Sequence, residues 1–343
     1  MFENLIGNER IKNILRRLVH EKRVPNAILF AGSDGVGKRQ FALELARAAV
    51  CHSPKDGESC GECQACVRVD VFTFPKADDK DAHMQVIFSE HPDVGVVIPY
   101  KRNILVDAIR NLEKEANFRP YEAEARFFIV DNADKMNAAA SNALLKTLEE
   151  PYQTTHIFLV TSRPDSLLPT IRSRCQVLRF APVQMDELER LLLKTHKYSQ
   201  ADARLIAAYS QGSVSEAQSI DLAEFRQRRD LMLRVLHGAL LKADTASLLR
   251  ASEEIADSKN KDFFEYYLDI LQSLIRDIWT LQSVGAQSVV NSDVLADLER
   301  MAKSADRARL SSWLEEIESL RETLDVNVNK RIAADALFVK MAA

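Results

Sequence analysis

The stretch GSDGVGK, residues 32–38, decides the fold of this chain. It follows a short apolar segment, Ala27–Ala31, and precedes residues 39–50, where apolar side chains recur at helical spacing. A strand, a turn with the pattern G-x-x-x-x-G-K and a helix are the setting in which backbone N–H groups and a lysine hold phosphate. The sequence therefore predicts a phosphate-binding loop, whose candidate nucleotide-binding residues are Gly32, Gly35, Gly37 and Lys38.

The alternation of apolar strands and helical patterns continues to about residue 181. Further strands are expected at Val94–Ile98, Phe127–Val130, Ile157–Val160 and Gln176–Phe180. Short, fully apolar strands between helices predict a parallel sheet that helices cover on both faces. Beyond Pro182 only helical patterns remain. We expect an α/β domain over residues 1–181, a small helical domain over 182–223 and a larger all-helical domain over 224–343.

Two positions of the phosphate site depart from what ATP hydrolysis requires. The motif needs Ser or Thr after the lysine to hold Mg²⁺, but Arg39 stands there and its side chain has only donors. Asp131 ends a predicted strand, as the second Mg²⁺ acid should, yet Asn132 follows it and cannot act as a base. We therefore expect no hydrolysis. Nucleotide binding stays open because the loop and Lys38 remain, and so does a loop kept only for packing.

Four of the five cysteines form a cluster in sequence with the spacing C-x8-C-x2-C-x2-C: Cys51, Cys60, Cys63 and Cys66. Four thiolates suit tetrahedral Zn²⁺ and leave no open coordination position, which favours a structural zinc module over residues 51–66. An iron–sulfur cluster is the alternative, although ferredoxin-type runs place their fourth cysteine downstream. Cys175 stands apart, and we expect it to be a half-buried, inert thiol.

The composition argues against two other functional classes. A formal net charge of −4 does not favour a chain that binds DNA tightly by itself, which usually needs a basic surface. The first ten residues, MFENLIGNER, are charged and lack the apolar core of a signal peptide. No apolar run approaches the roughly 18 residues of a membrane span. A cytoplasmic protein is expected.

Four features together resemble the AAA+ subunits of bacterial clamp loaders. They are the phosphate loop, the four-cysteine module after its helix, the segment SNALLKTLEEP at 141–151, and the SRC motif at 173–175. The triplet His91-Pro92-Asp93 is also similar to this family. The resemblance is dense over residues 1–182 and thin beyond. It implies an AAA+ domain, a helical lid at 182–223, and a helical collar at 224–343 through which subunits assemble.

Within this family, the residues favour a non-hydrolysing, stator-type subunit over the gamma/tau-type ATPase motor. A motor should have Ser or Thr at position 39, a Glu at 132 and an arginine in a later G-S-x-R element, where this chain has GSVS at 212–215. The resemblance further implies that Arg174, in the SRC motif, acts as an arginine finger on ATP bound by an adjacent motor subunit. A structural salt bridge is the alternative role for Arg174.

The resemblance implies a hetero-pentamer of this chain with gamma/tau motor subunits and a delta subunit, as part of a DNA polymerase III holoenzyme. Such an assembly opens the sliding clamp and places it on primer–template DNA. Two rival hypotheses remain, an autonomous AAA+ ATPase and a zinc-dependent DNA-binding module. ATP turnover by the isolated chain would indicate the first, and tight, salt-sensitive DNA binding by the chain alone would indicate the second.

Overall fold

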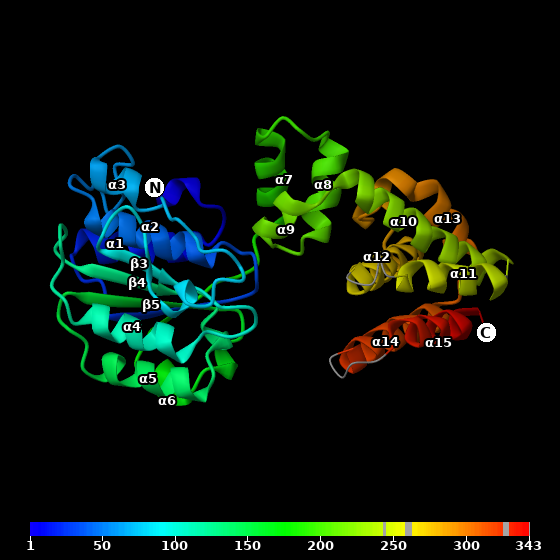
Figure 1. Cartoon of the computed structure of the whole chain (residues 1–343). Coiled ribbons are helices and arrows are strands. Elements are labelled where there is room, and N and C mark those ends of the chain that lie inside the picture. The colour runs from blue at the N-terminus through cyan, green and yellow to red at the C-terminus, as the bar shows by residue number, and fades with distance from the viewer. Residues whose placement is uncertain (243–244, 258–262, 325–328, 343) are drawn as a thin grey trace. The chain divides into compact units, whose positions relative to one another are not determined.

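The computed structural model describes residues 1–242, 245–257, 263–324 and 329–342 (Figure 1). The chain divides into two compact units. The first comprises Met1–Leu191 and Ser210–Gln218, and the second comprises Leu192–Tyr209 and Ser219–Ala343. The segment 182–223 is thus shared between the units, and the three-part division at residues 181 and 223 stays a prediction.

A six-stranded sheet with the order β2-β3-β4-β5-β1-β6 lies at the centre of the first unit. The strands are β1 (Ala27–Ala31), β2 (Ile87–Phe88), β3 (Val94–Val97), β4 (Arg126–Val130), β5 (Thr155–Thr161) and β6 (Gln176–Arg179). All five strands expected from the apolar runs are present, and they pair in parallel. The prediction missed β2, which pairs antiparallel with β3. Its two residues are too few to produce a periodic pattern.

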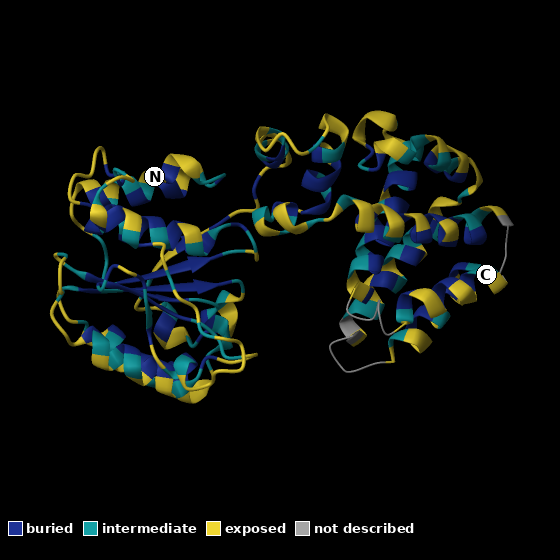
Figure 2. Cartoon of the chain, turned by 45° about the horizontal axis from the view of Figure 1, so that its top comes forward, coloured by how far each residue is buried: buried dark blue, intermediate teal, exposed yellow. Residues whose placement is uncertain are grey.

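Helices cover both faces of this sheet. On one face lie α1 (Glu9–His20), α2 (Lys38–Val50) and α3 (Gln64–Arg68), and on the other lie α4 (Val106–Ala116), α5 (Ala138–Glu149) and α6 (Pro169–Arg172) (Figure 1). Successive strand residues serve opposite faces, because side chains alternate along a strand. Ile28 and Phe30 of β1 join the core beneath α1 and α2, whereas Leu29 joins the core beneath α4 and α5. Figure 2 shows the strands buried between helices that are exposed on their outer sides.

The second unit is helical. It contains α8 (Gln200–Tyr209), α10 (Leu222–His237), α11 (Thr245–Ala256), α12 (Phe264–Ser283), α13 (Leu295–Ser304), α14 (Arg307–Leu324) and α15 (Lys330–Ala342). Boundaries between the two units fall within α7 (Met185–Lys194) and at the end of α9 (Val214–Ser219). The apolar stripe of α12, including Leu268, Leu271 and Ile275, is fully buried and forms the centre of this core. Among the described residues, no helix combines the length and apolarity needed to cross a membrane.

Candidate nucleotide site, cysteine cluster and arginine motif

The phosphate loop has the predicted strand–loop–helix geometry, but its lysine is turned inward. The loop follows β1, and α2 begins at Lys38. The Lys38 side chain is only 6% exposed, and its ammonium group donates to the carbonyl oxygens of Gly32 (2.7 Å) and Ser33 (2.6 Å). Burial lowers the pKa of Lys38, and the nearby Asp34 opposes that shift. The cation that should reach phosphate oxygens is therefore bonded to the loop's own backbone.

Arg39 and Asp131 form an ion pair inside the site. Nη1 of Arg39 lies 3.4 Å from Oδ2 of Asp131, and the Arg39 guanidinium carbon lies 5.0 Å from the ring centroid of Phe74. Burial raises the pKa of Asp131, and the charge of Arg39 offsets part of that effect. The carboxylate that would help to hold Mg²⁺ is thus paired with a fixed side-chain cation. Asn132, which follows Asp131, offers a carboxamide where a base is required.

The pocket at the phosphate loop has a volume of about 250 Å³. Its lining includes Lys38, Arg39, Asp131 and Ser215, but not Arg174. Small-molecule sites in proteins commonly enclose roughly 300–1,000 Å³. In this conformation, therefore, the pocket is small for a nucleoside triphosphate.

A segment far along the chain closes on the phosphate loop. The Gly35 carbonyl oxygen accepts hydrogen bonds from the N–H groups of Val214 (2.8 Å) and Ser215 (3.1 Å), at the start of α9. Gly35 has a φ of +73°, and a Cβ added there would lie 1.9 Å from Oγ of Ser213. The GSVS element thus contacts the loop through its backbone and a small side chain. The sequence carries no signal for this contact, because main-chain donors are common to almost all residue types.

The four clustered cysteines meet in space as their spacing predicts. All four Sγ atoms lie within 4.8 Å of one another, with 4.0 Å between Cys51 and Cys63 and 3.8 Å between Cys60 and Cys66. These separations exceed the roughly 2.05 Å of a disulfide. They match the separation of about 3.8 Å that follows from tetrahedral Zn–S bonds of about 2.3 Å. The cluster is therefore compatible with structural zinc.

Backbone N–H groups support the thiolate form of Cys60, whereas burial raises the pKa of Cys51 and of Cys66. The amide of Cys60 donates to Sγ of Cys51 at 3.3 Å, and the amide of Cys63 donates to Sγ of Cys60 at 3.3 Å. Hydrogen bonds from the backbone of Glu62 and Cys63 lower the pKa of Cys60 to about 6. A thiolate is the form that binds a metal. By contrast, Cys175 is partly buried, and burial raises its pKa to about 12, which agrees with the inert thiol expected there.

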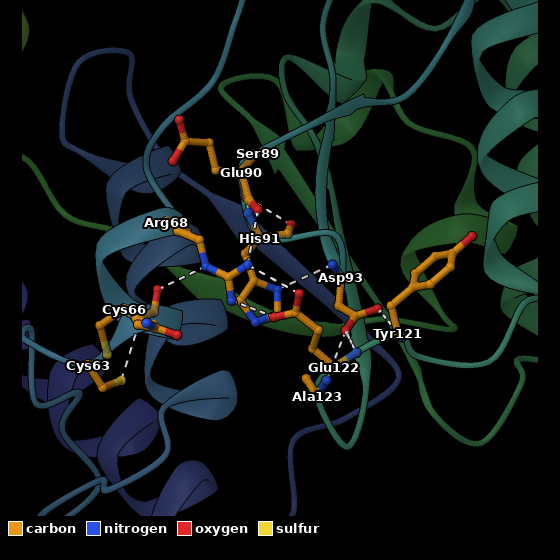
Figure 3. A network of polar contacts seen from close by, with 11 residues as sticks. Cys63, Cys66, Arg68, Ser89, Glu90, His91, Asp93, Tyr121, Glu122 and Ala123 are labelled. Carbon is orange, nitrogen blue, oxygen red and sulfur yellow. Dashed lines mark hydrogen bonds and ion pairs between the residues drawn. The ribbon is translucent and has the colours of Figure 1, made fainter.

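The HPD triplet at 91–93 links the cysteine module to the sheet (Figure 3). Asp93 is fully buried and accepts hydrogen bonds from three consecutive backbone N–H groups, those of Tyr121, Glu122 and Ala123, at 2.8, 2.8 and 2.9 Å. The side chain of Glu122 pairs with Arg68 of α3, two residues after Cys66. The triplet therefore has a structural role, because Asp93 fixes the loop that receives the module's arginine.

Arg174 lies at the surface and joins two of the sequence motifs. It follows α6, and its Nη1 donates to the carbonyl oxygen of Thr170 at 2.9 Å. Its Nη2 lies 2.7 Å from Oε1 of Glu149, which is the last residue of α5 and belongs to the SNALLKTLEEP segment. The Arg174 side chain remains 34% exposed. The guanidinium group is thus held by its own chain and is still accessible from outside.

Two protein-family models match this chain, one in its first half and one in its second half. A family model described as "DNA polymerase III, delta subunit" matches residues 7–184, and one described as "DNA polymerase III, delta subunit, C terminal" matches residues 223–339. The chain is 31% identical over 303 residues to DNA polymerase III subunit delta' of Escherichia coli (strain K12), covering 87% of this chain and 83% of that protein. The chain belongs to the DNA polymerase III delta-prime subunit family.

Other relatives extend the comparison of this delta-prime family member. It is 28% identical over 324 residues to DNA polymerase III subunit delta' of Bacillus subtilis (strain 168), covering 93% of this chain and 92% of the relative. Among solved structures, a DNA polymerase III gamma subunit-related protein of Thermotoga maritima aligns with a TM-score of 0.43 at 19% identity, covering 96% of this chain and 97% of that one.

Proposed function

We propose that this delta-prime subunit does not hydrolyse ATP itself and supplies Arg174 as an arginine finger to ATP bound by an adjacent gamma/tau motor subunit. The observation that carries the first part is the Arg39–Asp131 ion pair, with Nη1 and Oδ2 3.4 Å apart. It places a permanent cation beside the carboxylate that Mg²⁺ would need. With Asn132 in place of a base, the site lacks both the metal ligand and the group that orients water.

The surroundings of Arg174 support the second part. An ion pair between partly exposed side chains is worth only about 0–1 kcal/mol, so its contribution to the stability of the fold does not by itself explain Arg174. Arg174 and Glu149 are 34% and 50% exposed. A guanidinium group beside the γ-phosphate stabilises the charge that develops during phosphoryl transfer, and such a finger is worth about 10³–10⁵ in rate in GTPases.

The proposed assembly is a hetero-pentamer with gamma/tau motor subunits and a delta subunit, within the DNA polymerase III holoenzyme. This machine opens the sliding clamp and loads it on primer–template DNA during replication. The second unit of this chain, with its large helical core and no group of metal-holding side chains among the residues described, supports the collar role in subunit assembly.

We assign the cysteine cluster a structural Zn²⁺ held by Cys51, Cys60, Cys63 and Cys66. Four thiolate ligands complete a tetrahedral shell, so the metal would tie the ends of the 51–66 loop together and would have no position for a substrate. The fit rests on two Sγ separations, Cys51–Cys63 and Cys60–Cys66, which equal the tetrahedral value to within a few tenths of an ångström, and on all four Sγ atoms lying within 4.8 Å of one another.

The decisive experiment reconstitutes the loader from this chain and the motor and delta subunits of the same organism. We expect Arg174→Ala to leave assembly intact and to lower DNA-stimulated ATP hydrolysis at the adjoining site by about 10³-fold. The ATPase rate of the whole complex should therefore fall by the amount that this one site contributes. Arg172→Ala is the matched control, because Arg172 is 35% exposed and also forms a surface ion pair, with Asp165.

A charge swap distinguishes a finger from a structural salt bridge. The double variant Arg174→Glu/Glu149→Arg restores the ion pair with its ends exchanged, so a purely structural pair should recover full activity. A finger should not recover, because a carboxylate then faces the triphosphate. Unchanged ATPase and clamp loading with Arg174→Ala would overturn the assignment.

The alternative function, a gamma/tau-type motor, is tested with the isolated chain. We expect Mg²⁺-dependent phosphate release at the background rate, because no hydroxyl at position 39 is available to hold the metal. Turnover well above background that is lost in Lys38→Ala would favour the motor.

A further inference from the structure

We infer that Glu149 is the positioning residue for Arg174, holding the guanidinium group in the orientation from which it reaches the neighbour's triphosphate. The inference rests on the proposed finger role of Arg174 and adds a second residue to it. The observation is the contact of 2.7 Å between Nη2 of Arg174 and Oε1 of Glu149. This contact joins the SRC motif to the last residue of the SNALLKTLEEP helix.

Glu149 stands on a rigid support. The helix α5 is capped at its start by Asn137, whose side chain accepts a hydrogen bond from the Ala140 N–H at 2.9 Å. Leu144 and Leu148 are buried in the core beneath the sheet and fix the helix laterally. The carboxylate therefore projects from a fixed point, which is the condition for orienting another side chain.

The backbone around Arg174 offers much less restraint. The preceding helix α6 has only four residues, and arginine carries a large rotamer freedom that is lost when its fork is placed. Two contacts remove this freedom together. Nη1 donates to the Thr170 carbonyl oxygen and Nη2 to Glu149, so both terminal nitrogens are held and the plane of the guanidinium group is defined.

The held guanidinium group retains donors for a ligand. Each terminal nitrogen of arginine carries two N–H groups, and one contact to each leaves a second N–H on both. With 34% of the side chain exposed, these groups form a fork that is accessible to phosphate oxygens from outside the chain. Glu149 would stay bonded on one side while the triphosphate is contacted on the other.

The helix itself gains nothing from a carboxylate at this position. Glu149 occupies the last turn of α5, where the negative end of the helix dipole disfavours acidic side chains. The adjacent Glu150 is also exposed but lies outside the contact with Arg174. Stabilisation of the helix therefore does not explain Glu149, whereas its contact with the SRC arginine does.

The test is a double-mutant cycle in the reconstituted loader. The Arg174-dependent turnover is the ATPase rate of the wild-type loader minus the ATPase rate of the loader that carries Arg174→Ala. We expect Glu149→Ala to lower the kcat of this turnover about five-fold with KM for ATP unchanged, because orientation acts in the transition state. Glu149→Gln keeps an acceptor oxygen and should fall between Ala and wild type. Glu150→Gln is the matched control and should behave as wild type.

In the Arg174→Ala background, Glu149→Ala should have no further effect, because residues that act as one unit are not additive. A further loss in that background, or wild-type kcat for Glu149→Ala alone, would overturn the positioning role. If Arg174 is not an arginine finger, the result is different, because the loader with Arg174→Ala would then keep full ATPase activity. Equal melting temperatures of all variants, measured on the free chain, exclude a folding defect as the cause.

Discussion

Arg39 Nη1 lies 3.4 Å from Asp131 Oδ2, although the two residues are 92 positions apart in the chain. The contact places a guanidinium group where nucleotide hydrolases hold a magnesium ion between a hydroxyl and a carboxylate. Because arginine remains charged at all physiological pH values, the cation cannot leave the site as a metal can. The Arg39 guanidinium group thus balances the negative charge of the Asp131 carboxylate.

Removing this cation should restore metal-dependent binding. We expect Arg39→Thr to tighten Mg²⁺–ATP binding by at least about tenfold, roughly 1.4 kcal/mol, because it frees Asp131 and supplies the missing hydroxyl. Titration calorimetry with Mg²⁺ and with EDTA measures the effect. Hydrolysis should stay absent while Asn132 remains. Lys38→Ala in the same background should abolish the gain, and equal ATP binding in EDTA would contradict the prediction.

Adding a methyl group at Gly35 should disturb the contact between the phosphate loop and residues 213–215. Gly35→Ala places a Cβ 1.9 Å from Ser213 Oγ, whereas Gly61, with a φ of +75°, has no atom within 4 Å of the same position. Both substitutions carry the left-handed backbone cost of about 1–2 kcal/mol. Only Gly35→Ala adds a clash, so its melting temperature should fall several degrees further.

A second substitution tests that assignment. Ser213→Ala removes the hydroxyl that the new methyl group meets and should recover part of the lost stability in the Gly35→Ala chain. Equal melting temperatures for Gly35→Ala and Gly61→Ala would show that the phosphate loop accommodates the added methyl group without further loss of stability.

Zinc content should follow the four clustered cysteines and no other. We expect a single zinc ion per chain by elemental analysis, lost in Cys60→Ser and retained in Cys175→Ser, whose thiol lies outside the cluster. Structural zinc sites contribute about 10–16 kcal/mol in small domains, so metal loss should open the 51–66 loop to proteases. Iron in the purified protein, with visible charge-transfer absorption, would instead indicate an iron–sulfur cluster.

The first unit should lose stability as the pH falls below about 6.5, the ordinary pKa of histidine. Burial lowers the pKa of His156, which stacks on Phe127 and whose Nδ1 lies 3.0 Å from the Pro25 carbonyl oxygen. The unfolded chain therefore binds a proton at a higher pH than the folded chain, so unfolding is favoured from about pH 6.5 down to the folded pKa. One such group gives a slope of up to about 1.4 kcal/mol per pH unit.

Urea unfolding of the first unit between pH 7.5 and 5.5 measures this slope. His156→Gln should reduce it, because glutamine can still donate to the Pro25 carbonyl oxygen but does not titrate. The exposed His20, changed to Gln, is the control and should leave the slope unchanged. An unaltered slope in His156→Gln would assign the pH dependence to other groups, among which His91 also has a pKa lowered by burial.

Local patterns were sufficient for the α/β architecture and for the cysteine cluster. The apolar runs at β1, β3, β4, β5 and β6 mark strands because a buried parallel strand needs apolar side chains on both faces. At the start of α5 the Asn137 side chain accepts the free Ala140 N–H of the first turn, a role for which asparagine is one of the preferred residues. The antiparallel β2 has only two residues and left no such signal.

The sequence by itself determined what this chain lacks: a hydroxyl after the loop lysine, a base after Asp131 and an arginine in the GSVS element. It also determined the cluster of four thiols, because side-chain chemistry and short spacings are local properties. Only the tertiary structure decided which charges meet, pairing Arg39 with Asp131 and Arg174 with Glu149 and placing the Val214 N–H on Gly35. Those contacts depend on which strand and helix ends the parallel sheet brings side by side, and no spacing along the chain encodes that arrangement.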